Sequence, residues 1–169
     1  MNELNQNAAV RAELQSYQKR TLLYTRPGFL IRRLHQIHSW LFSEETSAFN
    51  ITPVQYSLLT ALRERGELDQ NSLALDIGLE RSSVAEVLPR LETRGLIERR
   101  QSPEDGRVKL VRLTREGRTL VKRMQPAVQR AHDRTIEQLP EEARDLFMLQ
   151  MIRLVEANNS HAVAPLRVR

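Results

Sequence analysis

The sequence of 169 residues has the length of one ordinary domain, and with 40% hydrophobic and 28% charged residues it can form a packed core. It has no cysteine, which excludes disulfides, thiolate metal sites, cysteine nucleophiles and thiol-based sensing. Because it shows no long apolar run and no signal-peptide pattern, we expect a cytoplasmic protein with no membrane partner. The net charge of +5 favours a polyanionic partner.

The N-terminal part of the chain predicts an arm followed by one long helix. Residues 1–24 carry only scattered apolar positions and are expected to form the arm or a short helix. Thr25 is a candidate helix cap, and Pro27 suits the first turn of a helix from about Gly28 to Glu45. We expect residues 25–50 to serve as a dimerisation helix.

The next segment predicts three helices and then two strands. Residues 52–65 form the first helix, and Gly78 separates the second, Gln70–Ile77, from the third, Arg81–Arg94. Two helices joined by a short turn that contains glycine are typical of a helix-turn-helix motif.

After the third helix the hydrophobic period becomes alternating. Residues 96–100 and 107–113 are predicted strands, and the pair Asp105-Gly106 favours a hairpin turn between them. The basic hairpin would form a wing, so residues 51–113 are predicted to be a winged helix-turn-helix region.

Two further helices are predicted after the wing. Thr114 can cap a helix that reaches about Gln138, and Pro140 begins a last helix. This last helix is apolar on nearly every side, and such a helix needs cover all round. A second copy of the chain is the simplest cover, so residues 114–157 are predicted dimerisation helices and residues 158–169 a flexible tail. The expected fold is mainly α with a small β-hairpin wing (α+β), in one compact domain.

The second helix of the motif is the element that would enter the major groove of DNA, with its N-terminal turn nearest the bases. Its candidate groove-facing side chains can bind phosphates or base edges, and they are Arg81, Ser82, Ser83, Glu86 and Arg90. In the wing, Arg107 suits a minor groove and Lys109 a phosphate. Positive charge is concentrated between Arg94 and Arg115. Each arginine taken alone is equally compatible with a solvated surface, so the combination carries the prediction.

Several short motifs follow one another in a fixed order, and they are Leu73-Ala74, Ser82-Ser83-Val84, Leu91-Glu92, Gly95-Leu96-Ile97, Asp105-x-Arg107 and Leu113-Thr114-x-x-Gly117. Together they resemble the MarR family of transcriptional regulators, from about Gly28 to Val155. The resemblance implies a triangular homodimer whose terminal helices interlock and whose winged motifs read a palindromic operator, usually to repress a promoter.

Carried over by position, the resemblance implies that the recognition helix contacts DNA through Arg81, Ser82, Ser83 and Arg90. The wing would contact DNA through Arg107, which Asp105 would brace. The sequence departs from the family at two positions of the recognition helix. Glu86 replaces the basic or small polar residue of many members, and Pro89 removes a helix hydrogen bond and favours a kink.

The helix that begins near Gly28 carries an unusual stripe, formed by Ile31, His35, His38 and Phe42. In one interpretation the two histidines line a pocket and bind an anion such as a carboxylate. In a second they are core or dimer-contact residues. A metal site is a third interpretation, for which no further ligand is evident nearby.

In proteins of the MarR type the effector pocket lies between the dimerisation helices and the winged motif. By this resemblance Arg26, Gln55, Tyr56 and Ser57 would join the histidines. The run from Thr25 to His38 resembles a subgroup linked to aromatic-acid catabolism, including nicotinate-pathway repressors. The implied effector is a flat aromatic carboxylate such as a hydroxynicotinate, with imidazole or guanidinium on the carboxylate and an aromatic side chain against the ring.

An enzyme is not expected, because no nucleophile and base pair, closed metal set or glycine-rich phosphate loop is evident. No cofactor is expected either. Two alternatives to an effector-controlled repressor remain open, since a fold does not fix a function. One is a winged-helix module that binds another protein, and the other is a DNA-binding dimer without an effector.

Overall fold

The computed structural model describes residues 3–167. These residues fall into two compact units, one up to Leu41 and one from Phe42 onward. The sequence predicted a single compact domain. The division has a physical cause, because among the described residues the buried hydrophobic side chains begin at Leu41 and almost all lie in the second unit.

The first unit consists of helices. It contains α1 (Glu3–Arg20), a short helical turn (Leu22–Thr25) and most of α2 (Pro27–Glu45), whose last residues belong to the second unit. The long predicted helix is therefore confirmed, but the predicted cap at Thr25 is wrong. Thr25 ends the preceding turn, where its hydroxyl donates to the carbonyl of Leu22 at 3.3 Å.

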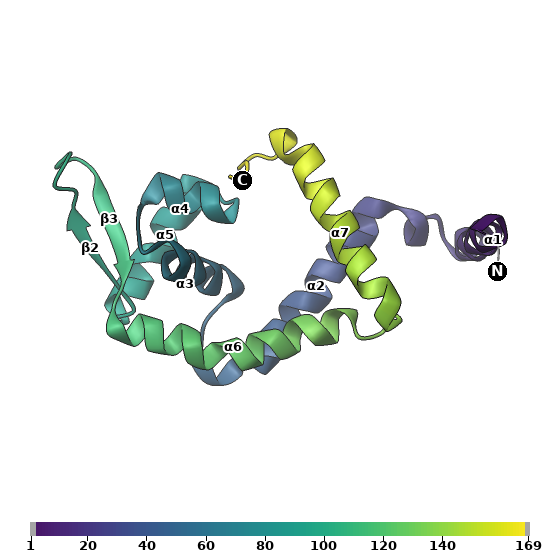
Figure 1. The fold of residues 1–169 in the computed structure, drawn as a ribbon, viewed down its shortest axis with the longest axis horizontal. Coiled ribbons are helices and arrows are strands. Elements are labelled where there is room, and N and C mark those ends of the chain that lie inside the picture. Colours follow the sequence, from purple (N-terminus) through teal and green to yellow (C-terminus); the bar gives the residue numbers. More distant parts are fainter. Residues whose placement is uncertain (1–2, 168–169) are drawn as a thin grey trace. The chain divides into compact units, whose positions relative to one another are not determined.

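The second unit contains the winged motif and the helices that follow it (Figure 1). Its elements after the short turn Ser47–Phe49 are α3 (Pro53–Arg65), β1 (Glu67–Asp69), α4 (Gln70–Ile77), α5 (Arg81–Thr93), β2 (Ile97–Gln101), β3 (Lys109–Leu113), α6 (Arg115–Ile136), α7 (Glu141–Asn158) and a last turn (Asn159–His161). This order confirms the predicted fold class, a mainly helical chain with a winged helix-turn-helix.

Side chains at the helix starts explain why the helices of the motif begin where they do. Thr52 and Gln55 form a reciprocal capping box at the start of α3. Asp69 caps α4 by accepting from the backbone N–H groups of Asn71 and Ser72. At the other end of α4, Gly78 has a φ of 63°, a left-handed conformation that suits glycine and turns the chain into α5.

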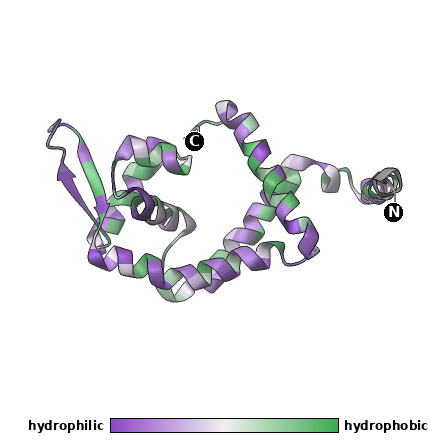
Figure 2. Ribbon diagram, in the orientation of Figure 1, coloured by the Kyte–Doolittle hydropathy of each residue, from purple (hydrophilic) through white to green (hydrophobic). Residues whose placement is uncertain are grey.

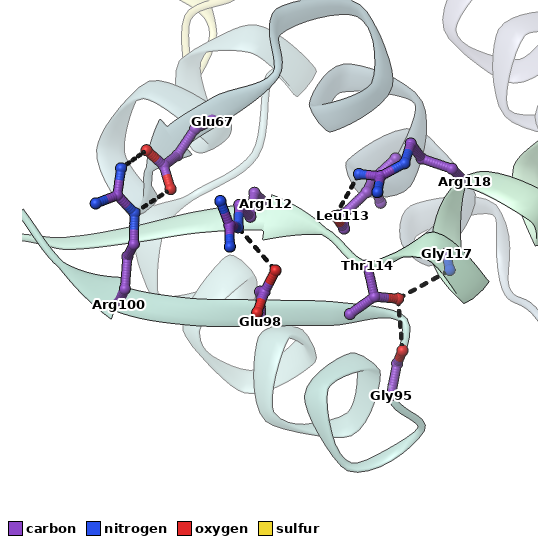
Figure 3. A network of polar contacts seen from close by, with 9 residues as sticks. All are labelled: Glu67, Gly95, Glu98, Arg100, Arg112, Leu113, Thr114, Gly117 and Arg118. Carbon is purple, nitrogen blue, oxygen red and sulfur yellow. Dashed lines mark hydrogen bonds and ion pairs between the residues drawn. The ribbon is translucent and has the colours of Figure 1, made fainter.

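The junction between the wing and α6 is held by Thr114. Its hydroxyl donates to the carbonyl of Gly95 at 2.7 Å and accepts from the N–H of Gly117 at 3.0 Å (Figure 3). A Cβ at Gly117 would lie 2.0 Å from the carbonyl oxygen of Leu96. Only glycine therefore allows α6 to approach the backbone of Leu96, just before β2, so closely.

The sheet has three antiparallel strands in the order β1-β3-β2. The predicted hairpin of β2 and β3 is confirmed, although the second strand begins at Lys109 rather than at residue 107. β1 was not predicted, because three residues are too few to show an alternating pattern. It pairs with β3 through Leu68 and Val111 and so attaches the motif helices to the wing.

The core of the second unit lies beneath α5. Val84, Leu88 and Leu91 are each at most 1% exposed and pack with buried residues of α3, α4, the sheet and α6. The spacing of these three residues in the sequence, at i, i+4 and i+7, predicts such a buried stripe, and the structure confirms it. α5 continues through Pro89 to Thr93, so the proline does not end the recognition helix.

α7 contrasts with this core, because none of its residues is fully buried. Leu146 is 57% and Leu154 61% exposed. α7 reaches Asn158. Within the predicted tail, residues 158–169, Asn159 forms hydrogen bonds with Leu166, and residues 168–169 lie outside the described residues. Of the helices in residues 3–167, none is both long and apolar enough to cross a membrane.

Candidate nucleic-acid interface

The outer face of α5 carries most of the predicted base-reading side chains. Since Val84, Leu88 and Leu91 are buried, helical spacing turns Ser82, Ser83, Glu86 and Arg90 to the opposite, exposed face. Arg81 is also exposed but lies at the N-terminal end of the helix, close to the edge of the buried stripe. The helix therefore offers a polar outer face and one arginine at its tip.

Arg81 is brought next to the wing in a recess of about 480 Å³. The recess is lined by residues from the starts of α4 and α5 and from the wing, and they are Asp69, Gln70, Asn71, Arg81, Arg107, Val108 and Lys109. Gln70 joins the two helix starts by donating from Nε2 to the carbonyl of Arg81 at 2.9 Å. Three predicted DNA-binding cations thus line one hollow, which the sequence alone did not show.

Asp69 is the acidic residue of this recess, but its carboxylate is committed to capping. It accepts from the backbone of Asn71 and from the backbone and hydroxyl of Ser72. Burial raises the pKa of Asp69, but these hydrogen bonds together outweigh burial and lower the pKa below its ordinary value. The carboxylate is therefore already satisfied within α4, and the recess keeps an excess of positive charge.

The wing tip is shaped by Asp105. Its Oδ1 accepts from the backbone N–H of Arg107 at 2.9 Å and lies 3.3 Å from the Nε of the same residue. The Arg107 side chain is nevertheless 93% exposed. Asp105 is therefore positioned to order the turn while the guanidinium stays accessible.

Other arginines near the wing are paired with glutamates. Arg100 binds Glu67 at 2.7 and 2.8 Å, and Arg112 binds Glu98 at 2.7 Å (Figure 3). Arg99 binds Glu92, and hydrogen bonds from Arg99 and Arg100 lower the pKa of Glu92 and Glu67 respectively.

These ion pairs neutralise part of the positive charge between Arg94 and Arg115. Within residues 3–167, no ion pair includes Arg81, Arg90 or Lys109. These three predicted DNA-binding cations lie on α5 and at the start of β3, the middle strand of the sheet. In Figure 2 the ribbon of β2 and of the loop to β3 has mostly hydrophilic colouring.

The predicted effector residues of the second unit divide into two groups. Phe42 is 3% exposed, and its ring lies 5.9 Å from the ring of Tyr56 at an angle of 58°. Gln55 and Ser57, in contrast, have local partners, because Gln55 forms the α3 capping box and the Ser57 hydroxyl donates to Pro53.

Thr60 was not found by sequence reasoning. It lies one helical turn beyond Tyr56, and its buried Oγ1 has no hydrogen-bond partner among the described residues. A threonine in a helix gives no sequence signal of this kind, because only packing decides whether its hydroxyl is satisfied.

The remaining effector candidates lie in the first unit. Arg26 and His35 are exposed, and His38 is partly buried. In the part of the chain that the structure describes, no three histidine or acidic side chains gather as a metal-binding group.

Comparison with known proteins shows which proteins this chain is similar to. The family model described as "MarR family" matches residues 51–109. The HTH-type transcriptional repressor NicR of Pseudomonas putida is 23% identical over 133 residues, which are 79% of this chain and 84% of NicR.

Two solved structures have the same fold. PcaV, a transcriptional regulator from Streptomyces coelicolor solved with its natural ligand, is 36% identical with a TM-score of 0.73, over 80% of this chain and 95% of PcaV. Bordetella bronchiseptica BpsR, whose DNA binding is regulated by 6-hydroxynicotinic acid, is 27% identical with a TM-score of 0.74, over 78% of this chain and 94% of BpsR.

Proposed function

The chain belongs to the MarR family of transcriptional regulators, and from this premise we propose that it is a homodimeric repressor released from a palindromic operator by a small aromatic carboxylate. Members of the family act as regulators of transcription rather than as enzymes. The operator-binding part of the proposal rests on one observation, the recess in which Arg81, Arg107 and Lys109 meet.

The recess fits duplex DNA because it places cations from two elements on one surface. A recognition helix in the major groove contacts bases with its first turn, where Arg81, Ser82 and Ser83 lie. An exposed guanidinium at the wing tip, Arg107, suits the negative potential of a minor groove. Lys109 neutralises a phosphate between them.

Dimerisation is supported by the apolar surface that the chain leaves exposed. The large exposed hydrophobics are concentrated in the first unit and in α7, and they include Leu22, Leu23, Tyr24, Ile31, Trp40, Leu146, Ile152, Leu154 and Val155. Exposed apolar area of this kind marks an interaction site. A second copy of the chain covers it, and two copies present two winged motifs to a palindrome.

The effector is proposed from residue chemistry and from the ligand of a relative. The Phe42 and Tyr56 rings offer an aromatic surface, and the unsatisfied Thr60 hydroxyl offers a hydrogen bond. In the proposal the carboxylate binds His35, His38 or Arg26. BpsR, whose DNA binding responds to 6-hydroxynicotinic acid, makes a hydroxylated heteroaromatic acid the first candidate. Binding favours a dimer whose recognition helices no longer match half-sites spaced by about 34 Å.

Fluorescence anisotropy tests the proposal. The purified protein is titrated onto labelled DNA from its own upstream region across a salt series, with 6-hydroxynicotinate, benzoate or 4-hydroxybenzoate added. Nicotinamide, which lacks the carboxylate, is the matched control compound. We expect tight, salt-dependent binding that one acid relieves and nicotinamide does not.

The other outcomes separate the alternatives. Binding that no acid relieves leaves a DNA-binding dimer and rejects the aromatic-acid effector. Absence of binding to upstream DNA at low salt rejects the operator function and favours a protein-binding module.

Thr60→Val tests whether Thr60 binds the effector. We expect this variant to increase the stability of the free protein and to weaken its binding of the acid. Removing a buried, unsatisfied hydroxyl stabilises the free protein by about 1 kcal/mol in urea unfolding, whereas loss of the hydrogen bond weakens the acid in a direct titration. Unchanged affinity for the acid would remove Thr60 from the pocket. Thr119→Val, in which the lost hydroxyl was bonded to the carbonyl of Arg115, is the matched control.

A further inference from the structure

The tail, defined as residues 159–167, leaves the end of α7 and returns to the helix-turn-helix motif. In Figure 1 the described part of the tail comes back to the end of α4, where Arg167 meets Leu75. The return is held by Asn159, whose Oδ1 accepts from the N–H of Leu166 at 2.8 Å and whose Nδ2 donates to the carbonyl of the same residue at 2.7 Å. One amide side chain thus satisfies both backbone groups of Leu166 and closes the tail into a loop.

The tail binds the end of α4 through Arg167. Its backbone N–H donates to the carbonyl of Leu75 at 2.8 Å, one of the carbonyls that a helix end leaves without an intrahelical partner. Its guanidinium lies 3.5 Å from Oδ1 of Asp76. The Asp76 side chain is only 10% exposed, and its other oxygen accepts from Nε of Arg65 in α3 at 3.1 Å. Asp76 therefore joins α3, α4 and the tail.

A second contact is made by Leu166 at the turn of the motif. A Cβ placed on Gly78 would lie 3.6 Å from Cδ1 of Leu166 and 3.8 Å from the carbonyl oxygen of Ala164, so the tail packs directly on this turn. Val163 and Ala164 then line a recess of about 550 Å³ together with Arg81 and Ser82 at the start of α5. The tail thus extends to the tip of the recognition helix.

From these contacts we propose that the outer face of α4, with Ser72, Leu75, Asp76 and Gly78, is a docking site for the tail of the same chain. The occupant fits in charge as well as shape, because the sequence after Glu156 contains no acidic residue and places Arg167 on a carboxylate. The docked tail ties α7 to the helix-turn-helix motif. A displacement of α7 therefore moves α4 and the N-terminal tip of α5 through the docked tail, and this route does not involve α6.

Each contact lies near the surface and is individually weak, so the tail docks reversibly. Hydrogen exchange measures such an equilibrium on the full chain in solution, without DNA or effector. Failure of this test is therefore distinct from failure of the proposed repressor function.

The experiment compares amide exchange in the full chain with that in a chain ending at Ala162. We expect the amides of α4 and of the turn at Gly78 to exchange about tenfold faster in the shortened chain, while the buried segment of α6 around Val121 and Met124 is unchanged. A synthetic peptide of residues 163–169, added in excess, restores part of the protection. Unchanged exchange in α4 after shortening overturns the proposal.

Point variants keep the test valid if the shortened chain fails to fold. R167A should accelerate α4 exchange several-fold, because it removes the ion pair with Asp76 and leaves the backbone contact. R153A removes an arginine from the exposed surface of α7 and is the matched control, for which no change in α4 is expected. Equal exchange in R167A, R153A and the parent chain rejects the assigned role of Arg167.

Discussion

The winged motif and α7 differ in how they place their apolar side chains. In the motif, α5 buries its apolar stripe at Val84, Leu88 and Leu91 within the second unit and leaves a polar face outside. In α7, apolar residues such as Leu146 and Leu154 remain more than half exposed. The motif thus completes its own core, whereas α7 leaves its apolar residues exposed in a single copy of the chain. Substitutions in the two regions should therefore fail in different ways.

The largest expected effect is on the folding of the motif. Leu88→Ala removes a side chain that is 1% exposed and leaves a cavity beneath α5. We expect a loss of about 3 kcal/mol in the free energy of unfolding, measured by urea denaturation at fixed protein concentration. A loss below about 1 kcal/mol would show that α5 is not anchored as its burial indicates.

The next effect distinguishes α7 from the motif. Leu154→Glu places a charge on the exposed apolar surface of this helix, so it should oppose pairing of two copies while leaving the winged motif folded. Light scattering at micromolar concentration should give a dimer for the parent chain and a monomer for the variant. A monomeric parent chain would contradict the proposed dimer.

Two arginines of the wing that differ in exposure provide a finer comparison, because the side chain of Arg107 is 93% exposed and that of Arg112 is 50% exposed. Arg107→Ala should weaken operator binding by about 1–2 kcal/mol and reduce the salt slope by about one, because an exposed cation is lost. Arg112→Ala, in which the lost guanidinium was paired with Glu98, is the matched control and should leave the slope nearly unchanged. Equal losses of affinity and of salt slope in Arg107→Ala and Arg112→Ala, measured at matched salt, would show that exposure does not decide which wing arginines bind DNA.

The smallest effect concerns acid stability. Hydrogen bonds from arginines lower the pKa of Glu45, Glu67 and Glu92 in the folded chain, with Arg130 and then Arg134 acting on Glu45. A lowered folded pKa stabilises the fold above the ordinary glutamate pKa of about 4.3, and this stabilisation is lost as the pH falls through the lowered values. As the pH is lowered below about 4.5, the urea concentration at the unfolding midpoint should therefore decrease. The decrease should be less steep in Glu67→Gln. An identical pH profile for this variant would remove Glu67 as a contributor.

Much of the fold could be predicted because its signals are local. The capping residues Thr52, Asp69 and Thr114 lie within three residues of the backbone N–H groups that they cap, and the stripe of α5 repeats at helical spacing. The short strand β1 was missed, because it is defined by pairing with β3 rather than by its own sequence. The cap at Thr25 was misplaced, since the same local pattern also suits the end of a short helical turn.

The sequence by itself determined the order of helices and strands, the face that α5 buries and the residue types available for DNA. Only the tertiary structure decided which charges are available, since Arg100 and Glu67 are 33 residues apart and their pairing leaves no periodic signal. The same holds for the contact between Arg167 and α4. Local hydrogen bonds and hydrophobic periodicity are encoded over a few residues, whereas partners across the fold are chosen by packing of the whole chain.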